Sequence, residues 1–164
     1  MACRPSGRGE PGGIPADGLR EGLQRLTANR HAQFIVFLHC ELAASLASAG
    51  RPWEAIALLE SYEQANPAPS TWCIPEFHRT RAEVALAVGE FERAERRLAR
   101  ARDLACKQGA VAWELRCVMT EVELQTILGR TQCPAHERLQ ILYDRYTDGM
   151  ETPDLCRARE LLAI

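Results

Sequence analysis

The stretch VGEFERAERRLARA, residues 88–101, decides the fold of this chain. Gly89 interrupts an otherwise continuous helical pattern, because glycine is unfavourable inside a helix and favoured just past its end. Phe91 follows the glycine, and Ala94 and Ala101 then recur on one side of the next helix. A helix, a glycine turn and a second helix with small residues on its inner side predict a closely packed helical hairpin.

The same arrangement recurs before and after this stretch. Gly50 precedes Ala55 and Leu59, and Gly129 precedes a helix whose buried face repeats with helical spacing. No segment alternates apolar and polar residues as a strand does, so the sequence predicts an all-α fold of about eight helices. The first helix is expected to begin at an Asp17 cap. The other seven are expected over about 31–49, 53–65, 75–88, 91–107, 111–128, 135–147 and 153–163.

The two ends of the chain differ in composition. Residues 1–16 are rich in glycine and proline and have little to bury, so we expect a disordered N-terminal tail before a helical domain over 17–164. Near the other end, Thr152, Pro153 and Asp154 form a helix-start signal. We expect the helix at Asp17 and the helix at 152–163 to cover the two ends of the core.

The composition indicates a soluble, cytoplasmic protein. The 164 residues are 46% hydrophobic, and the formal net charge of -2 gives no reason to expect nucleic acid or an anionic membrane as the main partner. No apolar run is long enough to span a membrane. The seven cysteines show no CxxC spacing, so we expect free thiols in a reducing compartment rather than a disulfide framework.

The sequence predicts no catalytic or metal site. The four histidines lie far apart, and neither His39 with Cys40 nor Cys73 with His78 has the spacing of a common metal site. A Cys/His catalytic pair would also need an orienting group and an oxyanion pocket, which the sequence does not identify. We therefore expect a protein that is not an enzyme and binds no metal or cofactor.

Five residues around the first stretch match a known repeat. Gly89, Phe91, Ala94, Leu98 and Ala101 resemble the turn and second helix of a tetratricopeptide repeat. This resemblance implies a right-handed α-solenoid of helix-turn-helix repeats, over about 31–69, 75–108 and 111–147, followed by a capping helix over 152–163.

Four longer blocks are similar to one bacterial family. FLHCELAASLASAGRPWEAIALLE, WCIPEFHRTRAEVALAVGEFERAE, QGAVAWELRCVMTEVEL and LYDRYTDGMETPDLCRARELL resemble, in this order, the C-terminal tetratricopeptide region of large regulators that carry a signalling ATPase. In that family the ATPase follows a nucleotide cyclase or a winged-helix DNA-binding domain. The chain departs from the family at Glu121, usually apolar, and at Met150, usually aromatic. It also has no GxxxxGK[ST] phosphate loop.

The resemblance implies an interaction or regulatory scaffold in signalling or transcription regulation. Its partner would be a protein or peptide, with an ATPase or regulator domain as one candidate. Helical repeats bind partners mainly through the concave face of their first helices. An alternative is a small-ligand or nucleic-acid effector domain that uses the same face. The arginines of 93–102 are compatible with phosphate binding, but acidic residues are interleaved with them, which is typical of a solvated helix face. The residues expected at the protein-binding face are Glu76, Arg79, Glu83, Leu86 and Arg116.

Overall fold

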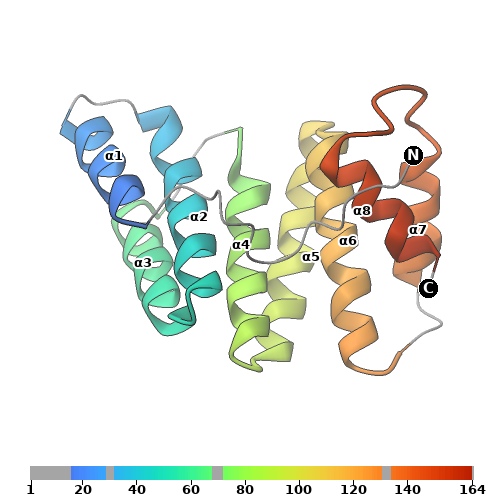
Figure 1. Ribbon diagram of the computed structural model, residues 1–164, viewed down its shortest axis with the longest axis horizontal. Helices are drawn as coiled ribbons and strands as arrows, with labels where there is room; N and C mark the ends of the chain where they lie inside the picture. Colours follow the sequence, from blue (N-terminus) through green and yellow to red (C-terminus); the bar gives the residue numbers. More distant parts are fainter. Residues whose placement is uncertain (1–15, 29–31, 68–71, 131–133, 164) are drawn as a thin grey trace.

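The computed structural model of the protein describes residues 16–28, 32–67, 72–130 and 134–163. Over these residues the chain forms eight α-helices and no strand, which confirms the expected all-α fold (Figure 1). The helices are α1 (Ala16–Ala28), α2 (Ala32–Ser48), α3 (Pro52–Ala65), α4 (Ile74–Ala87), α5 (Phe91–Gln108), α6 (Val111–Ile127), α7 (Pro134–Tyr143) and α8 (Pro153–Leu162).

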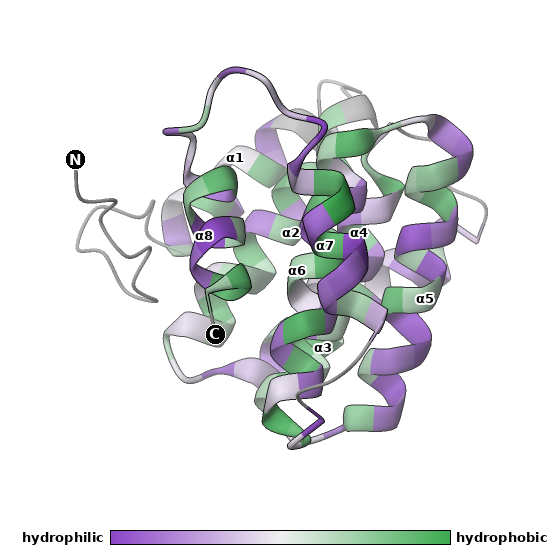
Figure 2. Cartoon of the chain, turned by 90° about the vertical axis from the view of Figure 1, so that its right-hand side faces the viewer, coloured by the Kyte–Doolittle hydropathy of each residue, from purple (hydrophilic) through white to green (hydrophobic). Residues whose placement is uncertain are grey.

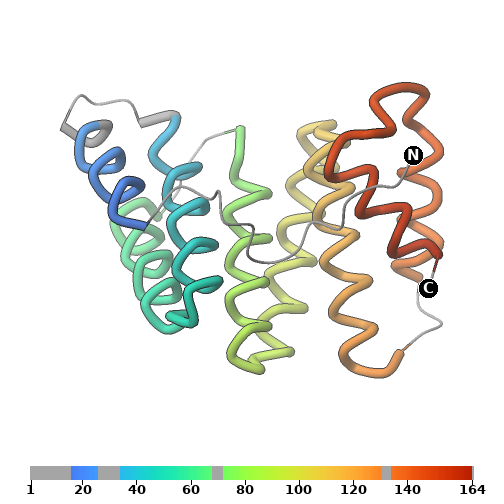
Figure 3. The backbone as a smooth tube through the Cα atoms, in the orientation of Figure 1, coloured from blue at the N-terminus to red at the C-terminus, as the bar shows by residue number. Residues whose placement is uncertain are grey.

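The even-numbered helices form a continuous row along the molecule. α2 contacts α4, α4 contacts α6 and α6 contacts α8, and the four helices follow one another along the long axis in Figure 1. Each odd-numbered helix packs against its neighbours in the chain, as the tube in Figure 3 traces, and among the described residues the backbones of the odd-numbered helices do not approach one another. The even-numbered helices are therefore the more closely packed layer of the stack.

The hairpin predicted from residues 88–101 consists of α4 and α5. α4 ends at Ala87, and Gly89 takes φ = +78°, a left-handed conformation that glycine adopts without a steric penalty. Phe91 begins α5 and packs partly buried against the core beside the turn. Ala82 and Ala94 are fully buried between the two helices, so no side chain holds the backbones apart at this point.

The two terminal helices cover the ends of the core, as expected. Leu19 of α1 joins the core cluster of α2 and α3. At the other end, Leu155 and Leu161 of α8 are buried against α6 and α7. Without these helices the end layers would expose apolar side chains to water.

The end of α7 differs from the sequence expectation. The helix ends at Tyr143 rather than near residue 147. The N–H of Asp144 still bonds to the carbonyl of Gln140, but those of Arg145 and Tyr146 bond only three residues back, to Leu142 and Tyr143. This tightened final turn ends the helix. Tyr146 packs partly buried against the core, although it lies outside the helix.

Four further expectations need correction or limits. Asp17 lies in the first turn of α1, not at its cap, and Thr152 occupies the N-cap of α8 without a side-chain capping bond. Cys156 is disulfide-bonded, so the expectation of free thiols throughout is wrong at α8. The expected disordered tail lies outside the described residues except for Ala16, which begins α1. The free cysteines among the described residues are Cys40, Cys73, Cys106 and Cys117.

Candidate functional site

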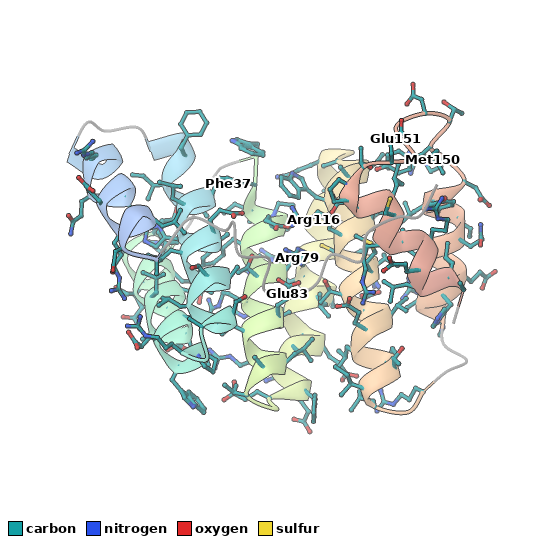
Figure 4. All side chains as sticks on the ribbon, viewed as in Figure 1. Phe37, Arg79, Glu83, Arg116, Met150 and Glu151 are labelled. Carbon is teal, nitrogen blue, oxygen red and sulfur yellow. The ribbon has the colours of Figure 1, made fainter. Side chains whose placement is uncertain are left out.

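The even-numbered helices have one side that no other described helix covers. Among the described helices α4 contacts only α2, α3, α5 and α6, so the side chains of α4 that point away from α3 and α5 have no helix above them. Figure 4 shows Arg79, Glu83 and Arg116 near one another in the middle of this row. We name this surface the even-helix face and define it by Phe37 and Glu41 of α2, Trp72 just before α4, Glu83 of α4, and Trp113 and Arg116 of α6.

A buried ion pair lies beneath this face, within α4. Arg79 donates from Nε and Nη2 to the two carboxylate oxygens of Glu76, at 2.7 and 2.6 Å. Its Nη1 also donates to Glu83 at 2.5 Å. Glu76 is only 2% exposed and Arg79 only 8%. Because the pairing is bidentate and buried, removing either partner would leave a charge in the protein interior that is less well compensated.

The ion pair also connects α4 to α6. Nη2 of Arg116 lies 2.9 Å from Oε1 of Glu76, and Nη1 of Arg79 lies 3.4 Å from the hydroxyl of Thr120. Burial alone would lower the pKa of Arg79, but attraction to Glu83 and Glu76 and the hydrogen bonds they accept raise it well above its ordinary value. Arg79 therefore remains charged at physiological pH, and Glu76 neutralises it from the same helix.

Glu41 of α2 adds a carboxylate that has no ion-pair partner among the described residues. Burial raises the pKa of Glu41 and repulsion from Glu76 adds to this, while Arg116 and Arg79 act in the opposite direction. Four carboxylates and two guanidinium groups thus share this region, which leaves two negative charges unbalanced. The fourth carboxylate is that of Asp154, whose Oδ1 lies 3.8 Å from Nε of Arg116. We name the set of six residues the inner charge cluster: Glu41, Glu76, Arg79, Glu83, Arg116 and Asp154.

Three aromatic rings form a row across α2, the start of α4, and α6. Phe37 and Trp72 stack with centroids 6.3 Å apart and an angle of 24° between the rings. Trp72 and Trp113 follow with centroids 5.7 Å apart at 32°. Trp72 is 51% exposed, so the row, which we name the aromatic row, presents apolar surface to solvent. The guanidinium carbon of Arg116 lies 5.4 Å from the ring centroid of Trp113, so a cation already occupies one ring of the row.

Sequence reasoning missed the aromatic row, although a signal for it exists. At three places in the chain an aromatic residue precedes a charged residue of the cluster by three or four positions. The pairs are Phe37 with Glu41, Trp72 with Glu76, and Trp113 with Arg116. Residues three or four positions apart lie on the same side of a helix. Two of the pairs lie within helices and the third spans the start of α4, so the repetition of this spacing could have indicated one shared surface.

The structure separates the predicted binding residues into three groups. Glu83 and Arg116 are partly exposed and lie on the even-helix face. Glu76 and Arg79, which were expected at the protein-binding face, are buried in the ion pair beneath that face. Leu86 packs against the core cluster that contains residues of α4, α5 and α6, so it does not join the charged residues.

The arginines of α5 mostly pair with acidic residues of neighbouring helices. Arg93 contacts Glu60 of α3, Arg97 contacts Glu63 of α3 at 2.9 Å, and Arg102 contacts Glu121 of α6 at 2.5 Å. Figure 2 shows the hydrophilic character of α5. These pairs hold the layers together and leave less positive charge available for a phosphate group.

The thiols and the cavity offer little chemical reactivity. Burial raises the pKa of the Cys117 thiol to about 12, so it stays protonated and is a poor nucleophile. A cavity of about 270 Å³ between α5, α6 and α7 is lined in part by Glu95, Glu121 and Arg138. Glu121 pairs with Arg138 at 3.0 Å, and Glu95 pairs with Arg130 at 3.0 Å. Within the part of the chain that the structure describes, no group of His, Cys, Asp and Glu side chains could hold a metal ion.

No protein-family model, no curated protein and no solved structure matches the chain. None of the described helices is both long and apolar enough to cross a membrane. The even-helix face combines an exposed aromatic row with an unbalanced charge cluster, an arrangement suited to binding.

Proposed function

We propose that this chain is a non-catalytic interaction scaffold that binds a protein or peptide segment on its even-helix face. The observation that carries the proposal is the aromatic row. Monomeric proteins seldom leave large aromatic side chains together at the surface, and tryptophan beside arginine is enriched at the energetic centres of protein interfaces. Trp72 is half exposed within the row, and Arg116 lies at its end.

The packing of the helices supports a right-handed stack of tetratricopeptide-like hairpins. α2 pairs with α3, α4 with α5, and α6 with α7, and the first helix of each pair belongs to the even-numbered row. A scaffold of this kind holds a binding surface on rigid helices, so little ordering entropy is lost when a partner binds. The sequence resemblance to the C-terminal region of ATPase-containing regulators supports a regulatory role in signalling, with an ATPase or regulator domain as a candidate partner.

Affinity capture with matched tryptophan variants tests this proposal. Trp72→Ala removes the centre of the aromatic row, whereas Trp53→Ala removes a tryptophan of α3 that is 64% exposed and outside the row. We expect wild-type chain and Trp53→Ala to capture the same protein from a native bacterial lysate, and Trp72→Ala to lose it. The captured protein would then be purified and its affinity for each variant measured by calorimetry.

A thermal-shift screen of nucleotides and metabolites tests the alternative function. A small molecule that stabilises the wild-type chain but not Trp72→Ala would assign the face to a small ligand. If wild-type chain and Trp72→Ala captured the same proteins with equal affinity, the even-helix face would not be the binding surface and the proposal would be wrong.

A further inference from the structure

Part of the central ring of the aromatic row is exposed to a partner. Trp72 is half exposed, and no guanidinium or ammonium group of the described residues lies over its ring. The neighbouring ring of Trp113 already holds the guanidinium group of Arg116, at 5.4 Å from its centroid. The row therefore has the chemistry to stack a planar cation, and one of its rings already does so.

A carboxylate without a partner lies one turn away from the same row. Glu41 follows Phe37 by one turn of α2, a rise of about 6 Å. Phe37 stacks on Trp72, so Glu41 lies beside the aromatic row, on the side of the inner charge cluster. The carboxylate of Glu76 is already occupied by Arg79 and Arg116, which leaves Glu41 as the acid available to a new partner.

The charge of the surface selects the kind of partner. The inner charge cluster carries two unbalanced negative charges, so an acidic or phosphorylated segment would be repelled. A purely apolar segment would cover Glu41 without pairing it, which is costly when the interface excludes water. A basic segment removes both penalties. Arginine suits the site better than lysine, because its planar guanidinium group stacks on a ring and donates two parallel hydrogen bonds to a carboxylate.

We propose that the partner of the even-helix face is a peptide segment that presents an arginine, which packs against the exposed part of Trp72 and pairs with the carboxylate of Glu41. An apolar residue beside this arginine contacts the remaining surface of Phe37 and Trp113. This inference rests on the proposed function and adds the chemistry of the partner to it.

Short fluorescein-labelled peptides test this inference by fluorescence anisotropy with the full chain. The peptides are identical except at one central position beside a leucine, which carries arginine, glutamine or glutamate. The arginine peptide is expected to bind at least about tenfold more tightly than the glutamine peptide, and the glutamate peptide is expected to bind most weakly. Equal binding of the three peptides, or binding of none, would overturn the inference.

Matched variants show whether the named residues recognise the peptide. Glu41→Gln and Trp72→Ala should each weaken binding of the arginine peptide about tenfold. Glu92→Gln on α5, whose side chain is 93% exposed, and Trp53→Ala on α3 should leave the affinity unchanged. Circular dichroism melts of all four variants confirm that each is folded at the temperature of the binding assay. Equal effects of test and control variants would contradict the assignment.

The peptide assay and the capture assay separate two failures. If capture of a protein depends on Trp72 but the peptides bind without preference for arginine, the inferred partner chemistry is wrong while the scaffold function stands. Sedimentation of the chain alone addresses a second copy as the occupant. Self-association that is lost in Trp72→Ala would replace the arginine segment by a second copy of the chain.

Discussion

Replacing Glu76 by glutamine is expected to destabilise the protein far more than the same replacement at Glu83, two turns further along α4. Glu76 is 2% exposed and pairs with both Arg79 and Arg116. Its loss of charge leaves the buried Arg79 with only the partly exposed Glu83, and Arg116 with only Asp154 at 3.8 Å. Breaking a buried ion pair in this way costs about 3–5 kcal/mol. The side chain of Glu83 is 39% exposed and contacts only Arg79, so its neutralisation should cost less than about 1 kcal/mol.

Urea unfolding and thermal melts followed by circular dichroism at neutral pH measure this difference. Glu76→Gln should lower Tm by roughly 10 °C or more, and Glu83→Gln by less than about 4 °C. The two variants change the same atoms on the same helix, so helix propensity and net charge are matched between them. Equal losses of stability would refute the reasoning, because they would mean that the carboxylate of Glu76 is as well solvated as that of Glu83.

Two further predictions concern packing and acid stability. Ala94→Arg should lower the free energy of unfolding by about 3 kcal/mol or more in urea titrations, because it forces a charged side chain between α4 and α5; an unchanged midpoint would show that the hairpin packs differently. Burial, aided by Arg97, lowers the pKa of His78 to about 4 from the 6.5 expected in the unfolded chain. The unfolded state therefore binds the proton first as the pH falls, and up to about 3 kcal/mol of stability is lost between about pH 6.5 and 4. His78→Gln should flatten urea stability over this range, and an unaltered slope would exclude His78 as its source.

Local chain chemistry predicted most of the helices. The hairpin of α4 and α5 is determined by residues that lie close together in the sequence, Gly89 at the turn and Ala82 and Ala94 between the helices. The turn and the close packing of the two helices could therefore be predicted from the sequence. The end of α7 was harder to predict. Tyr143 and Tyr146 continue the apolar spacing of the helix, but the backbone tightens after Asp144 and Tyr146 reaches the core from outside the helix.

The site could be predicted only in part, because its contacts join helices that are distant in the sequence. Helical spacing assigned Glu76 and Arg79 to one side of α4, but the spacing does not show that α2 and α6 approach close enough to bury them. The partner that Arg116 finds in Glu76 lies two helices earlier in the chain. The aromatic row depends on the same approach of the helices. In the sequence, each of its aromatic residues taken alone is typical of an ordinary core position.

Hydrogen exchange of the chain with and without its captured partner tests the central claim most directly. The account predicts that the partner slows amide exchange in the even-numbered helices Ala32–Ser48, Ile74–Ala87 and Val111–Ile127. Exchange in Pro52–Ala65 and Phe91–Gln108, which lie in the odd-numbered layer, should remain unchanged. Protection confined to α3 and α5, with α2, α4 and α6 unaffected, would contradict a scaffold that binds through its even-helix face.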